Sequence, residues 1–129
     1  MDSAADKKKI LIMDDEEMIG VIACQMLTLL GYEARHVFDG EAAISLYRQH
    51  LEKGDAFAAV IMDLTVPSGM GGKEAVRELL ALHPQARVLV SSGYSNDPSM
   101  VNFSEYGFCG HIEKPFDLTS LKTAIEAVL

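Results

Sequence analysis

Long hydrophobic runs are missing from the sequence, and cysteine is scarce. No stretch approaches the roughly 20 consecutive apolar residues of a membrane-spanning helix, and the polar residues 1–9 lack the apolar segment of a secretory signal peptide. The two cysteines, Cys24 and Cys109, fall within apolar segments. We therefore expect them to be reduced core residues in a reducing compartment, not a disulfide or a metal site. Repeats, linkers and low-complexity segments are also missing, so the chain is expected to form one domain.

Basic residues are also scarce relative to acidic ones. The 129 residues contain 11 Lys and Arg against 19 Asp and Glu, which gives a net charge of −8. A nucleic-acid-binding surface is therefore not expected on this domain. Apolar residues make up 49% of the chain, which is enough for a single core at this length. We expect residues 1–8 to be a polar lead-in and residues 9–129 to be one folded domain.

Apolar runs of strand length alternate along the chain with segments of helical periodicity. The runs 10–13, 58–64 and 87–90 are almost continuously apolar, which is typical of strands buried on both faces of a parallel sheet. The run 32–37 alternates charged and less polar residues and suits an edge strand. Such alternation predicts a doubly wound α/β fold with five parallel strands, the last at 108–112, and five helices covering both faces.

Two of the expected helices have clear sequence signals. Between positions 18 and 30, apolar residues recur at helical spacing before Gly31 ends the segment. This stripe consists of Met18, Ile22, Met26 and Leu29. Asp97 followed by Pro98 fits an N-cap with proline at the first helical position. The fourth helix is therefore expected to begin there and to run to Gly107.

Carboxylate, hydroxyl and ammonium groups follow four of the five expected strands. In chain order these groups are Asp14 and Asp15, Asp63, Ser91 and Ser92, and Lys114. The second strand, expected at the edge, contributes no such group. Ligands of doubly wound sheets bind outside the carboxyl ends of the strands, where the strand order reverses. These groups are therefore expected to converge on one rim of the sheet.

Three carboxylates at one rim repel one another and raise one another's pKa. A hard divalent cation relieves this repulsion, and carboxylates without Cys or His favour Mg²⁺ over Zn²⁺. With the cation bound, one carboxylate can attack a phosphoryl group, while the ammonium and hydroxyl screen the phosphoryl oxygens. Taken singly, Asp14 and Asp15 could be charges at a helix start, and Lys114 and Ser92 could be turn residues. Their joint occurrence at consecutive strand ends favours a site.

These residues, in this order, closely resemble the receiver domain of two-component response regulators. The resemblance extends from about Lys9 to Leu129 and rests on Asp14–Asp15, Asp63, Ser92 and Lys114–Pro115. It implies the flavodoxin-like fold with strand order 2-1-3-4-5. It also implies that residues 9–129 are the receiver domain.

By the same resemblance, Asp63 is the phosphoacceptor. Mg²⁺ is expected to be held by the side chains of Asp15 and Asp63, with Asp14 acting mostly through water. The backbone carbonyl of Thr65 is expected to supply a further ligand. Lys114 is expected to contact a phosphoryl oxygen, and its peptide bond to the following proline is expected to be cis.

Two further positions belong to the expected switch. The switch hydroxyl is assigned to Ser92 rather than Ser91, because the family places this hydroxyl 22 residues before the lysine, here Lys114. The position three residues before the lysine is usually Tyr or Phe and is His111 in this chain. We hypothesise that His111 still responds to Ser92, with a pH sensitivity that comes from imidazole titrating near neutrality.

The resemblance implies a signalling domain rather than an enzyme, with no catalysis beyond its own dephosphorylation. Its expected partner is a histidine kinase or a histidine phosphotransfer domain, and its expected location is cytoplasmic, without membrane contact by this domain. The surface of the fourth helix, fifth strand and fifth helix is expected to switch and could support a homodimer. The segments 69–75 and 91–98 look most like receivers of hybrid sensor histidine kinases, so a C-terminal receiver of such a kinase is expected.

Three alternatives stay open. The chain could be a free-standing single-domain response regulator. It could be a Mg²⁺-dependent phosphohydrolase with an aspartate nucleophile, although such enzymes usually carry a second Asp two residues later, where this chain has Thr65. It could also be an interaction module that works without phosphorylation, against which the complete acidic, hydroxyl and lysine set argues.

Overall fold

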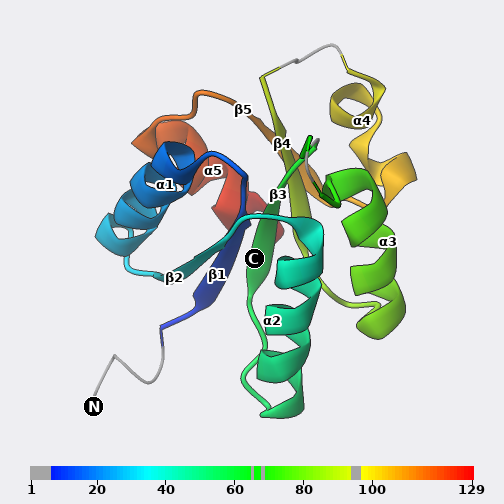
Figure 1. The fold of residues 1–129 in the computed structure, drawn as a ribbon. Coiled ribbons are helices and arrows are strands. Elements are labelled where there is room, and N and C mark those ends of the chain that lie inside the picture. Colours follow the sequence, from blue (N-terminus) through cyan, green and yellow to red (C-terminus); the bar gives the residue numbers. More distant parts are fainter. Residues whose placement is uncertain (1–6, 65, 68, 94–96) are drawn as a thin grey trace.

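The computed structural model describes residues 7–64, 66–67, 69–93 and 97–129. Five parallel strands form one sheet in the order β2-β1-β3-β4-β5, as predicted (Figure 1). The strands are β1 (Lys9–Met13), β2 (Glu33–Val37), β3 (Ala59–Asp63), β4 (Val88–Ser92) and β5 (Gly110–Glu113). The order reverses between β1 and β3, so the carboxyl ends of these two strands lie side by side.

Helices cover both faces of the sheet. Figure 1 shows α1 and α5 together on one side and α2 and α3 on the other. The four long helices are α1 (Glu17–Leu29), α2 (Gly40–Glu52), α3 (Gly72–Leu82) and α5 (Leu118–Val128). Among the helices of the described residues, none is both long and apolar enough to cross a membrane.

The fourth helix is much shorter than expected, so the prediction of five full helices is wrong for the described part of the chain. Helix α4 (Pro98–Val101) is a single turn, followed by the 3₁₀ turn η2 (Phe103–Tyr106). The break falls at Asn102, whose φ of −114° and ψ of 48° lie outside the helical region. Val101 and Asn102 are both weak helix formers, which explains why the helix ends here. Gly107, with φ of 100°, then closes the segment.

Side chains of the central strands alternate between two hydrophobic clusters, one on each face of the sheet. In β1, Leu11 and Met13 contact the cluster shared with α2 and α3, whereas Ile10 and Ile12 contact the cluster shared with α1 and α5. All four are at most 2% exposed. Because β1, β3 and β4 are covered on both faces, their sequences are apolar except at their ends, while the edge strand β2 is mixed.

The sequence did not show which face of α1 meets the sheet, and the expectation for one cysteine is wrong. Met18 is 69% and Leu29 is 77% exposed, whereas Met26 packs against the cluster shared with α1 and α5. The face that packs on the sheet instead carries Ala23 and Leu27, which are fully buried. Cys109 is also exposed rather than part of the core, and like Cys24 it forms no disulfide.

Candidate functional site

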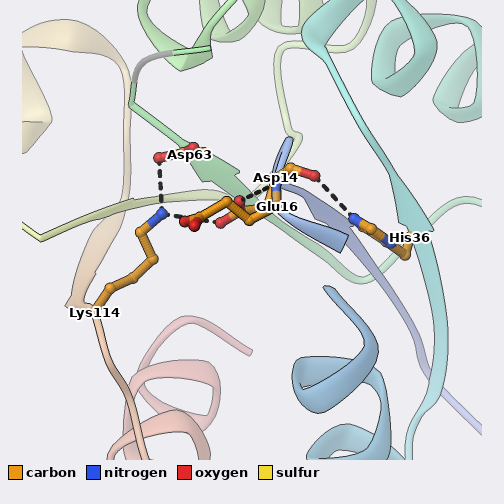
Figure 2. A network of polar contacts seen from close by, with 5 residues as sticks. All are labelled: Asp14, Glu16, His36, Asp63 and Lys114. Atoms are coloured by element: carbon orange, nitrogen blue, oxygen red, sulfur yellow. Dashed lines mark hydrogen bonds and ion pairs between the residues drawn. The ribbon is translucent and has the colours of Figure 1, made fainter. Parts of the chain in front are cut away.

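Four of the predicted site residues meet at the carboxyl ends of the strands. Asp14 follows β1, Asp63 ends β3 and Lys114 follows β5. One carboxylate oxygen from each of Asp14, Asp15 and Asp63 lies within 4.8 Å of the others. The Lys114 ammonium bridges two of them, with Nζ 3.0 Å from Asp14 Oδ2 and 3.2 Å from Asp63 Oδ1 (Figure 2). Residues up to 100 positions apart in sequence therefore form one polar cluster.

The backbone around Asp63 is fixed by a close contact with the start of α3. The amide of Gly72 donates to the carbonyl oxygen of Leu64 over 3.1 Å. A Cβ atom at position 72 would lie 2.7 Å from the carbonyl oxygen of Asp63. Only glycine allows the helix to approach this closely. On the other side, the amide of Leu64 donates to the carbonyl oxygen of Ser91 over 2.9 Å. The end of β3 is thus held between Gly72 and Ser91.

Asp14 is anchored through its backbone and its side chain. Its amide donates to the carbonyl of Val37 over 3.1 Å, and its Oδ1 accepts from the amide of Glu16 over 2.9 Å. Its own carbonyl oxygen lies 2.9 Å from Nε2 of His36, as Figure 2 shows. Both Val37 and His36 belong to the edge strand β2. With Lys114 on the other carboxylate oxygen, Asp14 is held in one orientation, and it is only 2% exposed.

His36 is the residue of this site that the sequence analysis missed, because the second strand was expected to contribute no carboxylate, hydroxyl or ammonium group at its carboxyl end. An alternating edge strand gives no reason to assign its single histidine to the rim. The signal that could have found it lies elsewhere, in the glycine at position 20, at the end of the first turn of α1. A Cβ atom at Gly20 would overlap the His36 ring.

The cluster is electrostatically unbalanced. Burial of Asp63 and the neighbouring charge of Asp14 raise the pKa of Asp63 from 3.8 to about 6, although Lys114 acts in the opposite direction. Burial alone would lower the pKa of Lys114, but its hydrogen bond to Asp14 and the charges of Asp63 and Asp14 outweigh burial and raise it. When all groups are ionised, three carboxylates and one ammonium leave a net charge of −2.

This net charge and the donor set fit a hard divalent cation. The three acidic residues supply only oxygen ligands, which suits Mg²⁺ and not the nitrogen and sulfur ligands of a structural zinc site. A bound dication would neutralise the excess charge of the cluster. The predicted fourth ligand, the backbone carbonyl of Thr65, lies outside the described residues.

The two serines lie at the end of β4, on opposite faces of the sheet. Ser91 is the parallel-sheet neighbour of Asp63, and Ser92 is the neighbour of Glu113. Alternation along β4 places Ser91 with Leu89 on the α1 and α5 side and Ser92 on the other side. Both side chains are buried, and among the described atoms Ser91 Oγ has no hydrogen-bond partner.

His111 lies in β5 beside Val90, at the strand position predicted for the switch aromatic. It is exposed, and its ring centroid is 5.0 Å from that of Phe103 in η2. The roles of His111, Ser91 and Ser92 stay predictions. The predicted cis peptide bond between Lys114 and the following proline is confirmed.

Comparison with known proteins agrees with this geometry. Residues 10–126 match the family model of the response regulator receiver domain. The chain is 29% identical to the chemotaxis protein CheY of Thermotoga maritima over 122 residues, which are 94% of this chain and 97% of that protein. It is 28% identical to the sensor kinase CckA of Brucella abortus, covering 93% of this chain and 12% of the kinase.

Solved structures give the same result. The crystal structure of the receiver domain of NtrX from Brucella abortus superposes with a TM-score of 0.83 at 28% identity, covering 93% of this chain and 97% of that domain. With the sheet order, the acidic cluster and the bridging lysine, these matches show that this chain belongs to the receiver domain family of two-component response regulators.

Proposed function

We propose that Asp63 accepts a phosphoryl group from a phosphohistidine of a partner protein. The observation that carries this proposal is the placement of Asp63 between a lysine ammonium and two further carboxylates, at the carboxyl end of a central strand. A carboxylate there can be both a cation ligand and a nucleophile. Its pKa of about 6 leaves it largely ionised at neutral pH and therefore competent to attack phosphorus.

The transfer moves one phosphoryl group between two side chains. An oxygen of Asp63 forms a bond to phosphorus while the phosphorus–nitrogen bond of the phosphohistidine breaks, and the electron pair of that bond stays on the imidazole nitrogen. Asp15 and Asp63 would hold Mg²⁺ through their side chains and Asp14 mostly through water, with Thr65 as the expected backbone ligand. The cation would supply positive charge to the phosphoryl oxygens. Lys114 exchanges its contact with Asp63 for a phosphoryl oxygen.

Phosphorylation would then shift the surface made by α4, β5 and α5. Ser92 is proposed to move towards the phosphoryl oxygens, and His111, which precedes Lys114 on the same strand, to respond. The phosphoryl group biases a pre-existing equilibrium between two arrangements of this surface. The same surface is proposed to support a homodimer. Water attack on the aspartyl phosphate resets the domain.

The partner is proposed to be a histidine kinase or a histidine phosphotransfer domain in the cytoplasm. The match to CckA, a sensor kinase of which this chain spans 12%, supports an origin as the receiver of a hybrid kinase. The match to CheY, which this chain spans almost entirely, fits a free-standing regulator equally well. Sequence upstream of the chain in its reading frame decides between the two.

Mass spectrometry of the intact protein tests the phosphoacceptor. The protein is incubated with Mg²⁺ and acetyl phosphate, and the wild type is expected to gain one phosphoryl group. Asp63→Asn is expected to gain none. Asp55→Asn is the matched control, because Asp55 is an aspartate that pairs with Lys9, outside the acidic cluster. Labelling of Asp63→Asn at the wild-type level would refute the assignment.

The competing phosphohydrolase function makes a different prediction. Such an enzyme would release phosphate from a phosphomonoester over many turnovers, whereas a receiver releases only the phosphoryl group that it has accepted. A steady-state phosphate-release assay with p-nitrophenyl phosphate separates the two. Turnover that depends on Asp63 would favour the phosphohydrolase.

A further inference from the structure

Gly20 is an unexpected residue at the end of the first turn of α1. Glycine destabilises a helix interior relative to alanine, because it loses more conformational freedom on folding. Gly20 is buried against the sheet. A Cβ atom at this position would overlap three atoms of the His36 imidazole, Cε1, Nε2 and Nδ1. The helix therefore omits a side chain at the point where the ring of His36 lies.

The imidazole that fills this space is oriented by two contacts. Nε2 lies 2.9 Å from the carbonyl oxygen of Asp14. A carbonyl only accepts, so Nε2 carries the hydrogen and donates it. The ring of Phe38 lies against the imidazole, with 4.5 Å between centroids. His36 therefore occupies one position, between α1 and the end of β1.

The carbonyl that His36 binds belongs to the peptide unit that joins Asp14 to Asp15. Because a peptide unit is planar, a hydrogen bond to its oxygen also fixes the direction in which the next residue leaves. The side chain of Asp14 is already held by Lys114 and by the amide of Glu16. His36 adds a contact to the peptide unit itself, at its carbonyl oxygen.

We propose that His36, in the space opened by Gly20, is a positioning residue that orients the Asp14–Asp15 turn for binding a divalent cation. This inference rests on the proposed function, because it gives His36 a role at the cation site. In metal sites, partners that orient a ligand commonly change metal affinity by about 10- to 100-fold when they are removed. Since His36 acts through the backbone, its effect belongs at the lower end of that range.

Two substitutions at position 36 separate the hydrogen bond from the ring. His36→Phe keeps an aromatic ring over Gly20 and loses the donor. His36→Gln loses the ring and keeps an amide donor at the same number of bonds from the backbone as Nε2. The probe is Mg²⁺ alone, titrated by calorimetry into the phosphodonor-free protein. His36→Phe is expected to weaken Mg²⁺ binding about 10-fold, and His36→Gln less than about 2-fold.

Urea unfolding of each variant, in the absence of Mg²⁺, shows how much of the protein is folded in the titration. If His36 only fills space, both variants lose stability while the folded fraction binds Mg²⁺ as the wild type does. That result overturns the proposal, as does an equal loss of affinity in the two variants. A loss confined to His36→Phe supports it.

Gly20→Ala provides a second test that leaves His36 unchanged. The added methyl group displaces the imidazole, so Mg²⁺ binding is expected to weaken about as much as in His36→Phe, about 10-fold. In a His36→Ala background there is no ring to displace, so Gly20→Ala is expected to change the affinity less than about 2-fold. Equal effects of Gly20→Ala in the two backgrounds contradict the proposal.

Asp15→Asn distinguishes failure of this inference from failure of the proposed function. If the wild type binds Mg²⁺ and Asp15→Asn does not, the acidic cluster is the cation site. An unchanged His36→Phe then overturns only the role of His36. If Mg²⁺ binds neither protein, or binds both equally, the cation site and the role of His36 are both wrong.

Discussion

Removing the charge of Asp63 should stabilise the protein. The raised pKa of Asp63 means that the folded state holds its proton more tightly than the unfolded state does. Below pH 3.8 the carboxyl group is protonated in both states. Between pH 3.8 and about 6 the unfolded chain loses the proton first, so the free energy of unfolding falls as pH rises. Above pH 6 Asp63 is ionised in both states, and its charge destabilises the folded state by the full amount.

The size of this penalty follows from the pKa. One pKa unit corresponds to about 1.4 kcal/mol, so a rise from 3.8 to about 6 destabilises the ionised, metal-free protein by about 3 kcal/mol. Asn has the shape of Asp without its charge. Asp63→Asn should therefore unfold with a free energy about 2–3 kcal/mol higher than the wild type at pH 7.5, and about equal to it at pH 4.

Urea denaturation followed by circular dichroism, from pH 4 to pH 8, measures this difference. Other titrating groups such as Asp55 and Asp117 are common to both proteins, so their contributions cancel in the comparison. Mg²⁺ should stabilise the wild type more than Asp63→Asn, because it binds only the folded state and prefers the complete set of carboxylates. A gap between the two proteins that does not change with pH would refute the reasoning, as would a less stable Asp63→Asn at pH 7.5.

Four further substitutions test other parts of the structure. Gly72→Ala places a methyl group 2.7 Å from the Asp63 carbonyl oxygen. It should lower the free energy of unfolding by about 1–3 kcal/mol and slow acetyl phosphate labelling. Labelling at the wild-type rate would contradict the close contact. Ser92→Ala should reduce the NMR shift changes that phosphorylation causes in β5 and α5, whereas Ser91→Ala should leave them unchanged; the reverse pattern would assign the switch to Ser91. Tyr47→Phe removes the hydroxyl that lies 2.7 Å from Nδ1 of His83. The free energy of unfolding, measured by urea denaturation, should fall by about 1 kcal/mol, and acetyl phosphate labelling should not change.

The central strands and their polar ends were predictable from sequence for a physical reason. Strands covered on both faces are mostly apolar, so β1, β3 and β4 are visible as apolar runs that stop at the polar residues of the site. In a parallel sheet these stops all lie at one rim. The convergence of Asp14, Asp63 and Lys114 follows from the topology once the strand order is known.

The features that sequence reasoning missed depend on tertiary packing. Helix α1 carries apolar residues around most of its surface, so spacing alone did not show that Ala23 and Leu27, and not Met18 and Leu29, face the sheet. The hydrogen bond from His36 to Asp14 joins two strands through a space that exists only because α1 has a glycine there. The residues on either side of His36 in the sequence, Arg35 and Val37, give no sign of this contact.

The shortness of α4 bears on how much free energy the proposed phosphoryl group must supply to change the conformation of this segment. This helix consists of one turn, closed by amides of Met100, Val101 and Asn102 that bond back to Asp97 and Pro98. Reversing a two-state equilibrium from 1:99 to 99:1 takes about 5.5 kcal/mol. All of this free energy has to come from the interactions that the phosphoryl group makes. In the proposed switch, rearranging α4 breaks at most these three main-chain bonds, whereas unfolding a helix of 13 residues such as α1 or α2 would break many more.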